Sequence, residues 1–340
     1  VAKHRLATSS DDISIIACMM VVMMHSPMPL PSSVGGSVFL SAVSYMSSPC
    51  IGLFFMVSGA LLLPCKSGLR DFLKKRLTKV IVPTIIWTLF YIMVSGRYGQ
   101  LERQLLSMPF SPQGSGVLWF MYVLVGLYLV TPVLSVWIER ASTRAIEFYL
   151  ALWAVTLCFP LLSLVIDVNE SVTGPFYYFS GYIGYYVLGY YMVNRPISMP
   201  MSLLSVLFVI AIVVPVVVRF LGIQVDFYRV FWYLSIFVAV MCMFWFRLLM
   251  LCGRRSFPLL TLVSNLSFGI YLCHIFIIRN LLWHTGLVSF EAPYPLRCIA
   301  VFIVAFTISL LICCIISWLP FGRYIIGYDN TRKHDGKKKN

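Results

Sequence analysis

Residues 202–222 read SLLSVLFVIAIVVPVVVRFLG, and this stretch decides which kind of fold the chain adopts. Its only charged residue is Arg219, close to its end. About 20 consecutive apolar residues in a helix cross the hydrocarbon layer of a bilayer, whereas a helix on a water-soluble protein keeps a polar face. The stretch therefore predicts a transmembrane helix.

The rest of the chain repeats this pattern. Of its 340 residues, 60% are apolar and 11% are charged, against roughly half and a quarter in an ordinary soluble domain. We therefore expect an all-α, polytopic integral membrane helix bundle with about ten transmembrane helices, formed by one membrane domain over residues 1–325 and followed by a flexible basic tail over 326–340. The ten apolar runs, bounded by charge, proline or glycine, lie at approximately 13–30, 40–64, 79–96, 117–138, 145–166, 176–194, 202–222, 229–251, 258–283 and 296–319.

The distribution of Lys and Arg predicts the orientation of the helices, because basic loops resist transfer across the membrane. With a cytoplasmic N-terminus, 20 of the 26 basic residues lie inside and six lie outside. Both termini are therefore expected in the cytoplasm. The net charge of +14 does not indicate nucleic acid as a partner, because the charges lie at helix ends and not on one face of a soluble domain.

The ten cysteines lie almost entirely within apolar runs and show no CxxC spacing. They indicate small core residues, with neither a metal site nor a disulfide framework. The N-terminal apolar run follows Asp11 and Asp12 and lacks a small-residue cleavage site, so we interpret it as a retained first helix.

Two histidines fall inside apolar runs, where an ionisable side chain is costly and is a functional candidate. His25 lies near the outer end of the first helix, just before a proline-rich break. It suits a general base, but a hydrogen bond to a neighbouring helix explains it equally well. His274 shares a helix face with Ser267 and Tyr271. Hydrogen bonding between helices is the simpler explanation for that histidine.

A basic cluster precedes Pro83 in KSGLRDFLKKRLTKVIVP, residues 66–83. It anchors the topology and meets lipid headgroups, or it binds a polyphosphorylated ligand, since several cations can hold a diphosphate. The cluster consists of Arg70, Lys74, Lys75, Arg76 and Lys79.

Tyrosines are dense in FYYFSGYIGYYVLGYYM, residues 176–192. Anchoring at the membrane interface is their usual role, and stacking on a sugar is an alternative. Three glycines in the same stretch, Gly181, Gly184 and Gly189, would let another helix approach closely.

Six segments, in this order, resemble the acyltransferase 3 family of membrane acyltransferases, which includes sugar O-acetyltransferases of bacterial polysaccharides. The resemblance covers roughly residues 10–325. The segments are DDISIIACMMVVMMHSP, GLFFMVSGALL, FLKKRLTKVIVP, LWFMYVLVGLYLVTP, YYVLGYYM and LSFGIYLCHIFII.

The resemblance implies transfer of an acetyl group from cytoplasmic acetyl-CoA to a hydroxyl of a lipid-linked or surface glycan, such as an O-antigen of lipopolysaccharide. The location implied is the bacterial inner membrane, with acetyl-CoA as donor substrate and no permanently bound cofactor. His25 matches the essential histidine of the family, and the basic cluster matches the loop thought to engage the acyl donor. Candidates for the acceptor pocket are Ser58, Trp119, Phe120, Tyr122, Tyr271 and His274.

One position departs from the family pattern. An Arg normally stands eleven residues before the first-helix histidine, and here that position is Ser14. A catalytically impaired member of the family is therefore an alternative. A transporter or flippase for glycans or acyl lipids is another, although the chain shows neither inverted repeats nor paired broken helices.

Overall fold

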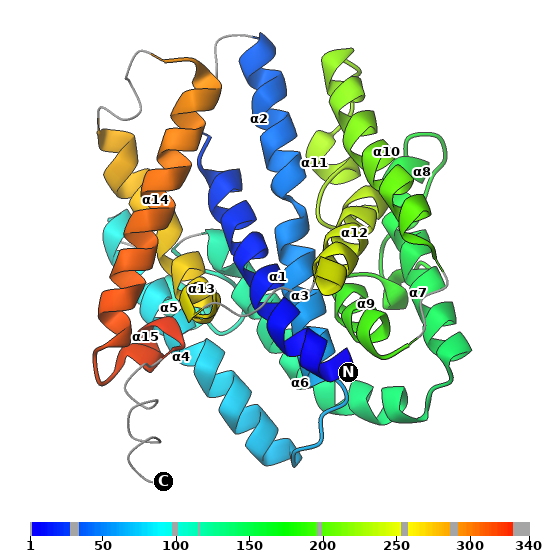
Figure 1. Ribbon diagram of the computed structural model, residues 1–340, viewed down its shortest axis with the longest axis horizontal. Coiled ribbons are helices and arrows are strands. Elements are labelled where there is room, and N and C mark those ends of the chain that lie inside the picture. Colours follow the sequence, from blue (N-terminus) through cyan, green and yellow to red (C-terminus); the bar gives the residue numbers. More distant parts are fainter. Residues whose placement is uncertain are drawn as a thin grey trace. The chain divides into compact units, whose positions relative to one another are not determined.

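The computed structural model describes residues 2–27, 34–96, 101–114, 116–195, 199–252, 258–285 and 292–328, and the side chains of residues 2–8 and 34 are not described. Within these ranges every regular element is a helix. Figure 1 shows long helices joined by short connections and small helical turns. The predicted all-α, polytopic membrane bundle is confirmed.

Seven helical segments of the described chain are long and apolar enough to cross a membrane. Three more of the predicted runs coincide with α1 (Ala2–His25), α9 (Ile183–Asn194) and α12 (Ile236–Cys252). With 12 and 17 residues, α9 and α12 are shorter than the roughly 20 residues of a perpendicular crossing. The exact number of crossings, like the orientation, stays a prediction. The seven segments are Gly35–Leu62, Leu69–Ser95, Gly116–Arg140, Thr143–Leu162, Met201–Phe220, Pro258–His284 and Tyr294–Ser317.

The chain forms two compact units, and both α1 and α6 (Trp119–Arg140) contribute to each. Unit 1 consists of Val1–Met24, Pro29–Pro64 and Val133–Phe257, and unit 2 of the remaining residues. Besides its parts of α1 and α6, unit 1 contains α9, α12, α2 (Val34–Ser47), α3 (Pro49–Leu62), α7 (Thr143–Leu157), α8 (Phe159–Leu162), η3 (Tyr177–Phe179), α10 (Met201–Phe220) and α11 (Phe227–Val230).

Unit 1 is built around a backbone-to-backbone contact between α3 and α9. A Cβ atom added at Gly59 would lie 1.8 Å from the Tyr186 carbonyl oxygen, and one added at Gly189 would lie 2.0 Å from the Met56 oxygen. Only glycine permits so close an approach, and small residues serve the same purpose in membrane helix pairs generally. The predicted role in close helix packing is confirmed for Gly189. It is also confirmed for Gly184, whose added Cβ atom would lie 2.1 Å from the Trp153 ring of α7, and it is wrong for Gly181, whose added Cβ atom would meet nothing within 4 Å.

Helix α10 contains Pro215, which cannot donate a backbone hydrogen bond to the carbonyl of Ala211. The fully buried Tyr45 of α2 donates its hydroxyl to that carbonyl, at 2.5 Å. Because hydrocarbon offers no water to satisfy a freed carbonyl, this tyrosine removes the cost of the proline and joins α2 to α10.

In unit 2, aromatic side chains attach α4 to its neighbours. The Tyr91 hydroxyl donates to the Leu272 oxygen of α13 at 2.8 Å, and the Trp87 indole donates to the Ile325 oxygen of α15 at 2.9 Å. Unit 2 contains α4 (Leu69–Ser95), α5 (Leu101–Ser107), η2 (Gly116–Leu118), α13 (Pro258–Phe276), the π-helical η4 (Ile277–Leu281), η5 (Leu282–His284), α14 (Tyr294–Ser317) and α15 (Gly322–Ile326).

Helix α15 lies at the C-terminal end of the described residues. Ile326 is fully buried, and a Cβ atom at Gly269 of α13 would lie 2.8 Å from its Cβ atom. The first residue of the predicted tail therefore belongs to the core of unit 2. Residues 329–340 of that tail lie outside the described residues.

Candidate functional site in unit 2

His25 is the last residue of α1 and belongs to unit 2. Its half-buried imidazole lies next to that of His274 in α13, with ring centroids 5.3 Å apart and an angle of 36° between the ring planes. The structure thus brings together the two histidines that the sequence singled out 249 positions apart.

His274 has a defined tautomer in its neutral form. Its Nδ1 atom lies 2.6 Å from the Tyr271 carbonyl oxygen. A carbonyl oxygen only accepts hydrogen bonds, so Nδ1 carries the proton and Nε2 presents a lone pair. The side chain is fully buried, and Nε2 has no hydrogen-bond partner among the described residues. A buried acceptor without a partner is costly, which makes this nitrogen a candidate for contact with a reacting group.

Aromatic rings continue from His274 toward α6. The Tyr271 ring lies 5.8 Å from that of His274, and the Phe120 ring lies 5.2 Å from that of Tyr271. Trp119 packs edge-on against Phe120, at 6.4 Å. The Tyr271 hydroxyl donates to the carbonyl oxygen of Val117. Four of the predicted acceptor-pocket residues therefore form one connected group with His25.

The other two acceptor-pocket candidates are Tyr122 and Ser58. Tyr122 donates its hydroxyl to the Met108 carbonyl oxygen at 2.6 Å, and so fastens the segment after α5 to α6. Ser58 lies on α3, within unit 1.

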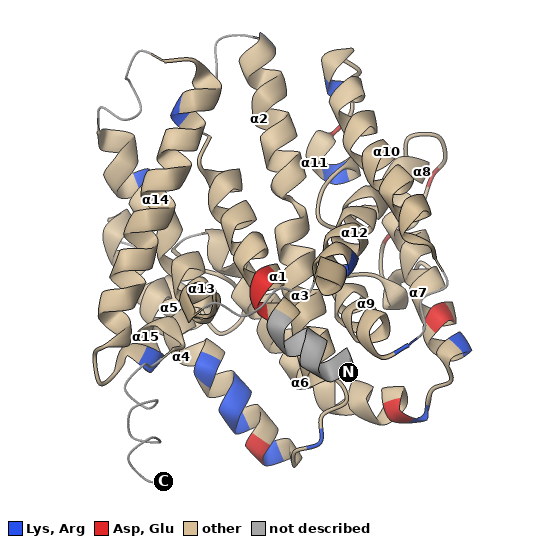
Figure 2. Cartoon of the chain, viewed as in Figure 1, with Lys and Arg blue, Asp and Glu red and all other residues tan. Residues whose placement is uncertain are grey.

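The basic cluster and Asp71 occupy the first turns of α4, where Figure 2 shows blue and red residues, and no residue of α4 after Lys79 is charged. At 3.6 residues per turn, Lys75, Arg76 and Lys79 lie on the same side of the helix as Phe72. Phe72 is buried and contacts Tyr128 of α6 edge-on, at 6.5 Å.

The other two members of the cluster, Arg70 and Lys74, lie on roughly the opposite side of the helix. In the described part of the chain no carboxylate forms a salt bridge with any of the five cations. Three cations of α4 thus share the side of the helix that carries Phe72.

Arg279 is a further candidate, one of the six basic residues that the charge distribution predicts to lie on the outer side of the membrane. It lies in η4, the π-helical extension of α13, and its guanidinium carbon lies 5.9 Å from the centre of the Trp283 ring. Arg279 follows His274 by five residues along the same helical segment. A π-helical turn often marks a functional site, but it leaves no signal in a single sequence.

Ser14 lies on α1 eleven residues before His25, which is three helical turns away on the same face. Its side chain is half-buried. In the described residues no group of three or more His, Cys, Asp or Glu side chains is arranged to hold a metal ion.

Comparison with known proteins identifies one family. A family model described as an acyltransferase domain, that of the acyltransferase 3 family, matches residues 13–318. No curated protein and no solved structure matches the chain. The matched range covers both histidines, the basic cluster and the aromatic group.

Proposed function

The chain belongs to the acyltransferase 3 family and is a multi-pass membrane acyltransferase, and from this premise we propose that it transfers acetyl from acetyl-CoA to a hydroxyl of a glycan. The contact between His25 and His274 carries the proposal, because it places a candidate base beside a buried imidazole whose acceptor nitrogen lacks a partner among the described residues. The location that we propose is the bacterial inner membrane, where the acceptor is a lipid-linked or surface polysaccharide.

His25 is the proposed general base. It takes the proton of the acceptor hydroxyl while the hydroxyl oxygen attacks the thioester carbonyl carbon. A C–O ester bond forms and the C–S bond breaks. His25 then returns the proton to the thiolate of coenzyme A. Attack by His25 itself, through an acetyl-imidazole, is the covalent variant.

His274 is the proposed positioning residue for His25. Its Nδ1–H donates to the Tyr271 carbonyl oxygen, so its Nε2 atom is available to accept a hydrogen bond from the neighbouring imidazole. Such a bond would leave the second nitrogen of His25 as the base, as the third member of a catalytic triad does for its histidine. In this proposal Arg279 would supply positive charge to the carbonyl oxygen that becomes negative during attack.

The proposed donor site is the basic face of α4. Lys75, Arg76 and Lys79 would hold the phosphates of acetyl-CoA, with Arg70 and Lys74 contributing less because they face the other way. From Lys75 to Tyr91, which binds α13 beside His274, α4 rises about 24 Å. The pantetheine arm would bridge this distance and carry the thioester from the cytoplasmic end of unit 2 to the histidines.

The test is His25→Ala in cells that depend on this protein for acetylation, with the O-acetyl content of surface polysaccharide measured by NMR. Removal of a general base lowers the rate by about 10²–10⁴-fold, so O-acetyl groups should be lost. The matched control is His284→Ala, because His284 is exposed in η5 and belongs to the same unit. Normal acetylation by His25→Ala at normal membrane abundance would refute the mechanism.

A further inference from the structure

Unit 1 contains a cavity of about 380 Å³ that the proposed chemistry does not use. Its wall comes from the end of α7, from α8, from the segment around Tyr182 and from α11 with the residues that follow it. Small-molecule sites commonly measure about 300–1,000 Å³, with a mostly apolar lining and a few polar groups. The cavity has both the size and the construction of such a site.

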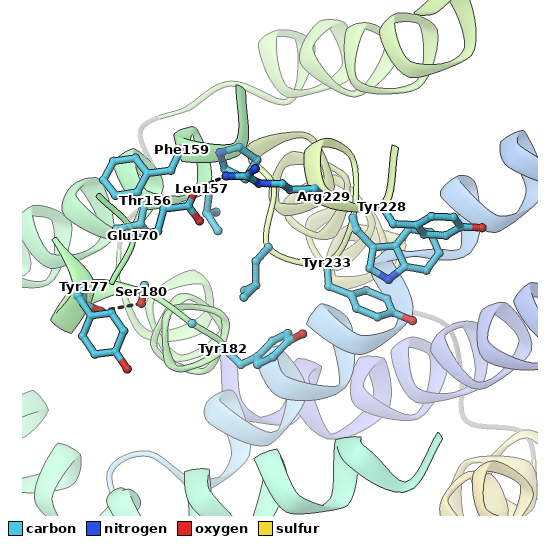
Figure 3. Close-up of a pocket in the computed structure, with 14 residues that line it drawn as sticks. Thr156, Leu157, Phe159, Glu170, Tyr177, Ser180, Tyr182, Tyr228, Arg229 and Tyr233 are labelled. Carbon is cyan, nitrogen blue, oxygen red and sulfur yellow. Dashed lines mark hydrogen bonds and ion pairs between the residues drawn. The ribbon is translucent and has the colours of Figure 1, made fainter. Parts of the chain in front are cut away.

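Aromatic rings form one wall of this cavity. The rings of Tyr228 and Trp232 meet edge-on at 4.8 Å, and the rings of Trp232 and Tyr233 lie 4.9 Å apart. Tyr182 also lines the cavity. In the view of Figure 3, Tyr182 and Tyr233 lie on the side opposite Arg229. Tyrosine and tryptophan offer an apolar face together with a polar edge, which suits a ligand that has both.

The polar rim of the cavity is formed by Arg229 and Glu170, whose charges are opposite and equal. Arg229 donates to Glu170 at 3.0 Å, and this ion pair joins α11 to the loop that follows α8. Arg229 is the only Lys or Arg among the lining residues. A phosphate would therefore compete with Glu170 for a single cation, whereas hydroxyl groups can donate to the carboxylate and accept from the guanidinium together.

The wall also contacts the part of α1 that belongs to unit 1, where the Tyr233 hydroxyl lies 3.2 Å from the sulfur of Met24. Asp226 caps the start of α11, accepting from the Arg229 backbone at 3.1 Å, so the rim residue is held in place. The predicted orientation puts the loops of Glu170 and Arg229 on the outer side of the membrane.

We propose that this cavity binds a sugar ring of the glycan acceptor. A pyranose presents C–H groups on its faces and hydroxyl groups at its edge, which matches an aromatic wall and a neutral, polar rim. A lipid tail has no polar group that could form a hydrogen bond with the Arg229–Glu170 pair. An anionic headgroup needs a cation, and the described lining contains no unpaired one. This inference rests on the proposed function, because it names the acceptor of that reaction.

The experiment measures binding directly, without catalysis. The purified chain in lipid nanodiscs is mixed with the methyl pyranosides of glucose, galactose, mannose and rhamnose, and saturation-transfer NMR is recorded against empty nanodiscs. At least one pyranoside should receive saturation from the protein. Tyr228→Ala should weaken its binding by about tenfold, the effect expected for one lost aromatic contact. Tyr228 is 62% exposed, so this change spares the fold.

Matched variants make the result decisive. Tyr228→Phe keeps the stacking face and should bind as the native chain does, and Phe220→Ala removes an aromatic ring of unit 1 that is 73% exposed and outside the cavity. The proposal is overturned if no pyranoside is saturated, or if Tyr228→Ala binds as tightly as Phe220→Ala. His25→Ala should still bind sugar. Native binding without any acetyl transfer would refute the proposed function and leave this site standing.

Discussion

The cavity of unit 1 and the histidine pair of unit 2 differ in whether their polar atoms have hydrogen-bond partners. Around the cavity, the hydroxyls of Tyr185 and Tyr233 reach a backbone oxygen and a sulfur, and Arg229 is paired with Glu170. In unit 2, the fully buried Nε2 atom of His274 has no such partner among the described residues. Satisfied groups suit binding of a ligand in one orientation, whereas an uncompensated nitrogen suits contact with a reacting group.

A second comparison sets the α3–α9 contact of unit 1 against the attachment of α4 in unit 2. In unit 1, Gly59 and Gly189 bring the backbones of α3 and α9 into contact. In unit 2, the hydroxyl of Tyr91 and the indole of Trp87 connect α4 to its neighbours by hydrogen bonds. An added Cβ atom suffices to disturb the α3–α9 contact, although unit 1 also has a directional contact between Tyr45 and α10. The hydrogen bonds of α4 suit a site that must hold side chains in precise positions.

The largest effect is expected from His274→Ala, which should change acetyl transfer in unit 2 and leave sugar binding in unit 1 unchanged. Without Nε2 to orient His25, acetyl transfer should fall about a hundredfold, which corresponds to about 2.7 kcal/mol in the barrier. The rate is measured with radiolabelled acetyl-CoA in inverted membrane vesicles. Sugar binding by the cavity of unit 1 should not change.

A conservative variant separates positioning from packing. His274→Gln keeps an acceptor at a similar reach, so it should recover part of the rate that His274→Ala loses. Equal rates for the two variants, with equal thermal stability, would mean that His274 only fills space. The proposed role of its Nε2 atom in orienting His25 would then be wrong.

A smaller effect is expected from Gly189→Ala, which tests the packing of unit 1. The added Cβ atom would meet the Met56 carbonyl oxygen at 2.0 Å, so α3 and α9 must separate. We expect a loss of about 1–3 kcal/mol in stability, measured as a lower midpoint of thermal unfolding in detergent. Gly126→Ala in α6 is the control, because its Cβ atom meets nothing within 4 Å. Equal midpoints for both variants would contradict the packing argument.

The smallest effect is expected at the N-terminal end of α4. The double variant Lys75→Ala, Arg76→Ala should raise KM for acetyl-CoA about tenfold, because exposed ionic contacts each contribute about 1 kcal/mol or less. The matched double variant Arg70→Ala, Lys74→Ala removes the same charge from the opposite side of the helix. A similar rise in KM for both pairs would show that α4 acts only through its total charge.

Much of the candidate site followed from the residues themselves. An ionisable side chain within an apolar run is costly, so His25 and His274 could be singled out without any structure. The resemblance to the family then supplied Trp119, Phe120 and Tyr271, which lie beside them. Arg279 could not be found in this way, because an Arg at a helix end is ordinarily an anchor. The cavity was equally hidden, since its lining comes from separate stretches of the chain.

Hydrophobicity alone determined that the chain spans a membrane as a helical bundle, because runs such as residues 202–222 have no other stable environment. The sequence also indicated which residues are expensive to bury. Only the tertiary structure decided which of them meet: His25 with His274, and Tyr45 with the carbonyl that Pro215 leaves free. Apolarity is a property of each segment by itself, whereas a contact between side chains depends on how helices distant in sequence pack together.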